Sequence, residues 1–124
     1  MKVRNLVVLG AAVLLGCLEV NSPPKRILTA RLVTGGIELL NHSDRTLYIF
    51  AADPDTLAVM DFTPCSVPDA CGGIAPGTSE EVPFDEIEGY SEQSRDVVVL
   101  HWFLVPDGEA FKPDTVRGLL LRLR

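Results

Sequence analysis

The chain has 124 residues, with 17 acidic and 11 basic side chains and a formal net charge of −6. An acidic balance disfavours binding to nucleic acid or direct adhesion to anionic lipid, because both of these present negative charge. The length corresponds to one domain, which can bury a core without the help of a metal ion.

The first residues have the layout of a secretory signal peptide. Lys2 and Arg4 give a basic start, and residues 6–16 follow without a polar side chain. A bilayer core of about 30 Å needs roughly 20 apolar residues in a helix, so this run is too short for a stable membrane-spanning anchor. The layout therefore predicts a signal peptide over residues 1–16.

The end of this run reads Leu14-Leu15-Gly16-Cys17, which resembles the lipobox of bacterial lipoproteins. In that family the cysteine thiol is joined to diacylglycerol, and cleavage before the cysteine makes it the new N-terminus. The resemblance covers residues 1–18 and implies lipid attachment at Cys17 and an extracytoplasmic location in the bacterial cell envelope. Leu18, rather than Asp, follows the cysteine, which in that family favours the outer membrane where one exists. An ordinary signal peptide and an uncleaved helix are the alternatives.

Residues 17–26 are expected to form a tether between the lipid and the domain. Pro23 and Pro24 favour an extended, semi-rigid chain in this stretch. A single domain is then expected over residues 27–124.

Cys65 and Cys71 lie in a stretch rich in proline and glycine, FTPCSVPDACGG. In an oxidising compartment, such an even pair predicts a disulfide that closes a surface loop. The loop-entropy model gives a ring of this size roughly 2–2.5 kcal/mol of stabilisation. A metal or redox site and free thiols are the alternatives, although the spacing matches neither a zinc ribbon nor a redox C-x-x-C motif.

Alternating and β-branched runs separated by turn residues predict an all-β domain. The strongest run, residues 96–105, is apolar on both faces, so we expect a central strand with Trp102 buried. The pattern favours an antiparallel β-sandwich of about seven strands, immunoglobulin-like in broad architecture, with a small β-barrel as the alternative. Further strands are predicted over residues 26–33, 36–40, 46–52, 56–62 and 115–124, with a shorter stretch around Val82 and Phe84.

The candidate chemistry is sparse. His42 precedes Ser43 and Asp44, but neighbours in one tight turn cannot easily face each other as nucleophile and base, so a solvated turn is expected. His101, in the strand over residues 96–105, is expected to be structural; the alternative is a metal site with His42, Met60 or an acid. An acidic run could offer oxygen ligands to calcium, but its spacing matches no calcium loop, and a solvated face is expected. Its members are Glu80, Glu81, Asp85, Glu86, Glu88 and Glu92.

These observations predict a lipid-anchored envelope lipoprotein with a non-catalytic binding or structural domain. Its expected partners are the membrane, through the lipid, and an envelope protein or polymer; no cofactor, metal ion or nucleic acid is expected. The alternative is an envelope enzyme or a metal-handling protein that uses His101, His42 or both.

Overall fold

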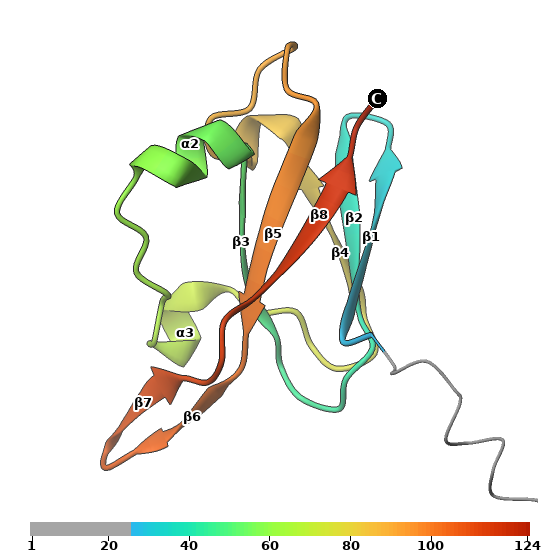
Figure 1. Ribbon diagram of the computed structural model, residues 1–124. Coiled ribbons are helices and arrows are strands. Elements are labelled where there is room, and N and C mark those ends of the chain that lie inside the picture. Colours follow the sequence, from blue (N-terminus) through green and yellow to red (C-terminus); the bar gives the residue numbers. More distant parts are fainter. Residues whose placement is uncertain (1–25) are drawn as a thin grey trace, which may run out of the picture.

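Eight strands make up much of residues 26–124, the part of the chain that the computed structural model describes (Figure 1). Two antiparallel sheets have three strands each, in the orders β1-β2-β4 and β3-β5-β8, and β6 and β7 form a separate hairpin. The predicted all-β, sandwich-like fold is confirmed. The strands are β1 Leu28–Val33, β2 Gly36–Asn41, β3 Tyr48–Ala52, β4 Ser79–Pro83, β5 Asp96–Trp102, β6 Leu104–Asp107, β7 Ala110–Pro113 and β8 Arg117–Arg122.

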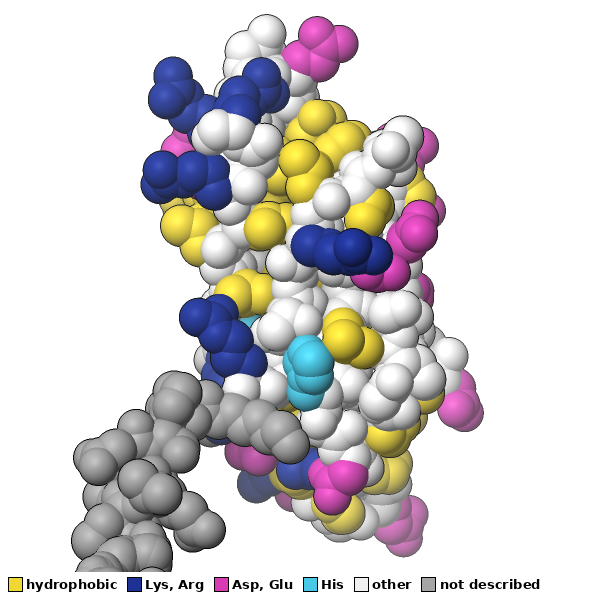
Figure 2. Space-filling model, turned by 90° about the vertical axis from the view of Figure 1, so that its right-hand side faces the viewer, with side chains coloured by type: hydrophobic (Ala, Val, Ile, Leu, Met, Phe, Trp, Pro, Cys, Tyr) yellow, Lys and Arg dark blue, Asp and Glu magenta, His cyan; other side chains and the backbone are white. Residues whose placement is uncertain are grey.

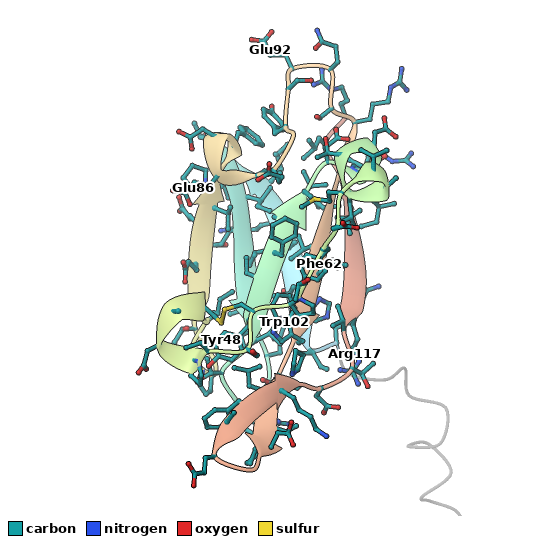
Figure 3. All side chains as sticks on the ribbon, turned by 90° about the vertical axis from the view of Figure 1, so that its left-hand side faces the viewer. Tyr48, Phe62, Glu86, Glu92, Trp102 and Arg117 are labelled. Atoms are coloured by element: carbon teal, nitrogen blue, oxygen red, sulfur yellow. A yellow bond between two sulfur atoms is a disulfide. The ribbon has the colours of Figure 1, made fainter. Side chains whose placement is uncertain are left out.

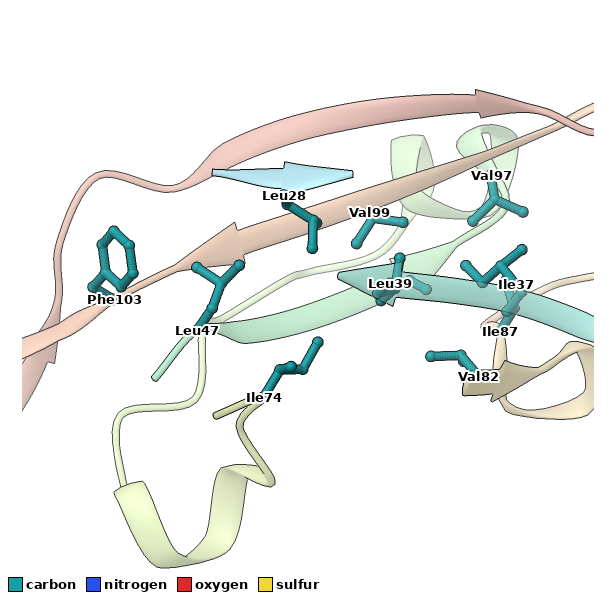
Figure 4. Close-up of a cluster of buried hydrophobic side chains, with 11 residues drawn as sticks. Leu28, Ile37, Leu39, Leu47, Ile74, Val82, Ile87, Val97, Val99 and Phe103 are labelled. Atoms are coloured by element: carbon teal, nitrogen blue, oxygen red, sulfur yellow. The ribbon is translucent and has the colours of Figure 1, made fainter. Parts of the chain in front are cut away.

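The core lies between the two three-stranded sheets (Figure 4). Ile37 and Leu39 of β2 are fully buried against Val97 and Val99 of β5 and their neighbours. Both pairs follow the period of two that places alternate strand residues on one face. The remaining members of the core cluster are Leu28, Leu47, Ala51, Ile74, Val82, Ile87 and Phe103.

The sheets stay separate within residues 26–124, so the small β-barrel does not form there. On one side, isolated bridges join Leu47 to Ile74 and Ala52 to Glu88. On the other side, β1 and β8 are the edge strands of the two sheets and run close to each other (Figure 1).

Asn41 joins the end of β2 to two other segments and has no exposed surface. Its side-chain amide donates to the carbonyl oxygens of Arg45 at 2.7 Å and Ile74 at 2.9 Å. Its side-chain oxygen accepts from the backbone N–H of Ser43 at 2.9 Å and from the Ser43 hydroxyl at 2.7 Å. The turn expected at His42, Ser43 and Asp44 is therefore held by local side-chain bonds, as residues of this type favour.

The strand predicted over residues 56–62 is wrong. Residues Pro54–Val59 form the helix α2, and Asp53 is its N-cap. The Asp53 side chain accepts from the backbone N–H groups of Asp55 at 2.8 Å and Thr56 at 3.4 Å, and Pro54 stands in the first turn. A side-chain acceptor at the N-cap, followed by proline in the first turn, favours the start of a helix. In this segment that preference outweighs the β propensity of the residues that follow.

The strand predicted over residues 96–105 is interrupted at Phe103. Phe103 is buried in the core beneath the guanidinium of Arg45, which lies 4.2 Å from the ring centroid. Beyond Phe103 the chain leaves the sheet, because β6 pairs with β7 instead of β3. The sequence did not predict β7, and β8 begins at Arg117, two residues later than expected.

Candidate binding cleft

The predicted disulfide between Cys65 and Cys71 is confirmed, with a Cα–Cα distance of 5.8 Å. It encloses the short helix α3, Pro68–Cys71, in the segment that was predicted as a surface loop. The backbone N–H groups of Ala70 and Cys71 both donate to the carbonyl oxygen of Val67. The ring is therefore stiffened from within as well as closed by the two sulfurs.

Residues 60–66, which we call the strap, link α2 to the disulfide ring and cross the outer face of the β3-β5-β8 sheet. Trp102 joins the sheet to the strap, because its indole Nε1 donates to the carbonyl oxygen of Cys65 at 3.0 Å. Trp102 is 2% exposed, as predicted from the sequence. Its outward position follows from the strand period, because Val97 and Val99 of the same strand point into the core.

Phe62 of the strap completes an aromatic group with two side chains of the sheet. Its ring centroid lies 4.9 Å from that of Phe50 and 5.7 Å, edge-on, from that of Trp102. Both distances fall in the range at which tilted aromatic pairs attract each other. Figure 3 shows Phe62, Trp102 and Tyr48 gathered over the same sheet.

A cleft of about 330 Å³ lies between the strap and the sheet. This volume is at the lower end of the range for small-ligand sites, which are mostly apolar with a few polar groups at chosen points. Asp61 and Thr63 are exposed and supply such groups at its rim. The lining residues are Ile49, Phe50, Met60, Asp61, Phe62, Thr63, Cys65 and Trp102.

Apolar surface continues on the same face of the sheet, on β5 and β8. Leu120 is 59% exposed and pairs in register with the half-buried Val98. Gly118, which has no side chain, pairs with Leu100 and so leaves that leucine partly open. Val59, in the last turn of α2, is also well exposed.

The two histidines have different surroundings. His42 is exposed after β2, and its Nε2 lies 2.8 Å from the Thr29 hydroxyl. His101 is buried in β5, where Nδ1 lies 3.3 Å from the carbonyl oxygen of Val99. Burial lowers the pKa of His101, and the nearby charge of Arg117 acts in the same direction. Within residues 26–124, no three His, Cys, Asp or Glu side chains form a metal-binding group.

The acidic run has mixed positions. Glu80 and Glu81 are exposed on the edge strand β4, whereas Asp85 and Glu86 belong to a single turn of 3-10 helix, Phe84–Glu86. The rings of Phe84 and Tyr90 stack with their centroids 4.4 Å apart beside a separate hollow that Glu88 and Glu92 also line. These carboxylates face solvent, as a solvated acidic surface should.

The sequence predicted no cleft, so the aromatic residues Phe50 and Phe62 were missed, and Met60 was named only in an alternative metal site. Met60 and Phe62 were placed in the strand that does not form. The helix-start pattern at Asp53 and Pro54 was the available signal, because a helix there turns the following residues into a connection across the sheet.

Cys17, the predicted site of lipid attachment, and the rest of residues 1–25 lie outside the described residues. Among residues 26–124, no helix has the length and apolar character required to cross a membrane. No protein-family model matches the chain, and no match was found among curated proteins or solved structures.

Proposed function

We propose that the chain is a lipid-anchored lipoprotein of the bacterial cell envelope whose domain binds another envelope component without catalysing a reaction. The lipobox-like residues 14–17 support the anchor. The disulfide between Cys65 and Cys71 is consistent with an oxidising, extracytoplasmic compartment, where such bonds persist.

The observation that carries the binding role is the cleft beneath the strap. The disulfide ring and Trp102 fix the strap from one end, so the aromatic walls of the cleft are in place before a ligand arrives. Such preorganisation reduces the entropy that binding must otherwise cost.

The negative charge of the domain favours a basic partner. Asp61 stands at the rim of the cleft, and acidic residues outnumber basic ones in the chain. A basic partner is attracted by this field, and an apolar side chain on it fits the walls of the cleft. The proposed ligand is therefore a basic envelope protein or polymer that presents an apolar group.

Photo-crosslinking in intact host cells tests this proposal. A photoreactive residue replaces the exposed Thr63 at the rim; in a control chain it replaces the exposed Glu109, in the turn between β6 and β7. One basic component should be captured from position 63 and not from position 109, and Asp61→Lys should abolish the capture. Equal capture from both positions, or capture that Asp61→Lys does not change, would contradict the proposal.

A further inference from the structure

A further hollow, of about 270 Å³, lies beside Arg26, the first residue that the structure describes. Three segments form it: the residues that lead into β1, the end of β5 and the start of β8. The register of β5 and β8 places His101 directly opposite Arg117. The lining residues are Arg26, Ile27, Leu28, His101, Arg117, Gly118 and Leu119.

This hollow is basic in an acidic domain. Arg26 and Arg117 are both exposed, and no acidic side chain lines the hollow. The ion pairs found within residues 26–124 use other arginines, Arg31 with Glu38 and Arg122 with Asp96. Among residues 26–124, neither guanidinium group of the hollow forms an ion pair, so no acidic side chain of this part of the chain competes with a ligand for their donors. Figure 2 shows basic side chains spread over one face of the domain, with hydrophobic side chains between them.

His101 adds a polar group that is 94% removed from solvent, since its exposed fraction is 6%. Its Nδ1 lies 3.3 Å from the carbonyl oxygen of Val99, and because a carbonyl oxygen can only accept, we assign the neutral ring its hydrogen on Nδ1. Nε2 is the nitrogen that gains or loses the titrating proton. An anion in the hollow would offset the charge of Arg117 and favour a hydrogen on Nε2.

We propose that this hollow binds a phosphate group, as the free anion or as a phosphate ester, between the guanidinium groups of Arg26 and Arg117 and beside His101. Guanidinium groups donate two parallel hydrogen bonds to phosphate oxygens, which gives both strength and orientation. The apolar side chains of Ile27, Leu28 and Leu119 form the rest of the lining. The proposal does not depend on the ligand of the aromatic cleft or on lipid attachment.

The two histidines make a direct test possible. The carbon-bound imidazole hydrogens of the full chain are followed by NMR in a nonionic detergent while inorganic phosphate is added at constant pH and ionic strength. The His101 signals should shift to saturation, and the His42 signals should stay in place. A His101 shift that does not saturate, or equal shifts of both histidines, would overturn the proposal.

Variants of exposed arginines provide the control. Arg26→Gln and Arg117→Gln should each weaken phosphate binding by about tenfold or more, the effect of losing charge-assisted hydrogen bonds. Arg95→Gln removes an exposed arginine that does not line the hollow and should leave the affinity unchanged. The same affinity in all three variants would show general charge screening and overturn the proposal.

The source of the phosphate is decided by a second ligand. A short-chain phosphatidylglycerol, used below the concentration at which it forms micelles, presents a lipid headgroup phosphate in solution. Saturable His101 shifts with this lipid assign the hollow to membrane headgroups; shifts with inorganic phosphate alone assign it to the soluble anion. If neither ligand shifts His101 to saturation, the hollow is not a phosphate site.

Discussion

The indole nitrogen of Trp102 and the carbonyl oxygen of Cys65 lie 3.0 Å apart, and this hydrogen bond joins the centre of the sheet to the disulfide ring. The two residues are 37 positions apart in the chain. The disulfide ring of Cys65 and Cys71 is thereby held against β5. The strap, which leads from α2 into this ring, therefore has little freedom to move. This attachment holds one wall of the aromatic cleft against the sheet.

Two substitutions of Trp102 separate its hydrogen bond from its volume. Trp102→Ala should lower the free energy of unfolding by about 3–5 kcal/mol, the usual cost of truncating a large buried side chain. Trp102→Phe keeps much of the apolar volume but loses the hydrogen-bond donor. The free energy of unfolding should therefore fall by less than in Trp102→Ala, by about 1 kcal/mol for the hydrogen bond plus the cost of the lost volume. Urea denaturation measures both, and an unchanged midpoint for Trp102→Ala would contradict the buried position.

Asn41 should be the most sensitive polar side chain of the domain. Asn41→Ala removes the side-chain hydrogen bonds to the carbonyl oxygens of Ile74 and Arg45. Because the Ile74 oxygen keeps its bond from the backbone N–H of Leu47, the cost is that of the lost bonds, about 1 kcal/mol each. The exposed neighbour His42 provides the control, because His42→Ala removes only a contact with the Thr29 hydroxyl. Urea midpoints that fall equally in the two variants would show that the hydrogen bonds of Asn41 add no more to stability than the exposed contact of His42.

Asp53 couples α2 to the segment before β5. The Ser94 hydroxyl donates to its Oδ2 at 2.6 Å and lowers the pKa of the Asp53 carboxyl, against the opposing effect of burial and with help from the backbone N–H groups of Asp55 and Thr56. A carboxyl with a lowered pKa stabilises the fold above its ordinary pKa, and this stabilisation is lost as the pH falls through the lowered value.

Replacing the N-cap tests this coupling. Asp53→Ala should cost about 1 kcal/mol or somewhat more, since both the helix cap and the acceptor of Ser94 are lost. Asp55→Ala, an exposed change in the first turn of the same helix, should cost much less. Thermal unfolding at neutral and acidic pH gives the comparison, and the difference between the two variants should shrink at acidic pH. A constant difference at all pH values would argue against the ionised cap.

His101 should also make stability depend on pH, at pH values above those at which Asp53 titrates. Its pKa is lowered from 6.5 by burial and by Arg117, against the effect of its bond to Val99, so the unfolded chain binds a proton more readily than the folded one. Stability from this group is complete above pH 6.5 and declines as the pH falls from there toward the lower pKa of the folded state.

The two histidine variants check this sign. Denaturant midpoints between neutral pH and about pH 5 should fall less in His101→Gln than in the parent chain, because glutamine does not titrate. His42→Gln should retain the parent's dependence, since His42 is exposed in the turn after β2. The prediction fails if both variants show the same pH dependence as the parent.

Local patterns predicted the sandwich well because its inner faces follow the period of the strand. Leu39, Val97 and Val99 alternate with residues that point outward, and all three are buried where that alternation places them. The disulfide was predictable for a similar reason, because Cys65 and Cys71 are near each other in the chain and flanked by turn residues. Both predictions use information contained in a few neighbouring residues.

The cleft was not predictable in this way, because it depends on a competition and on distant contacts. Residues 56–59 were predicted as part of a strand, but the N-cap at Asp53 starts a helix in this segment. The end of β5 depends on Phe103 turning into the core under Arg45, a residue 58 positions earlier in the chain. No local pattern indicates that Phe62 meets Phe50 and Trp102, since tertiary packing brings them together.

Lipid attachment at Cys17 decides where the domain works, and mass spectrometry of the intact chain extracted from host membranes measures it directly. The proposal predicts a protein that begins at Cys17 and carries the added mass of a diacylglyceryl group, with or without a third acyl chain. Cys17→Ser should yield a chain without this mass that no longer partitions into the detergent phase. A membrane-extracted chain with an unmodified Cys17, or a serine variant that partitions like the parent, would contradict the lipid anchor.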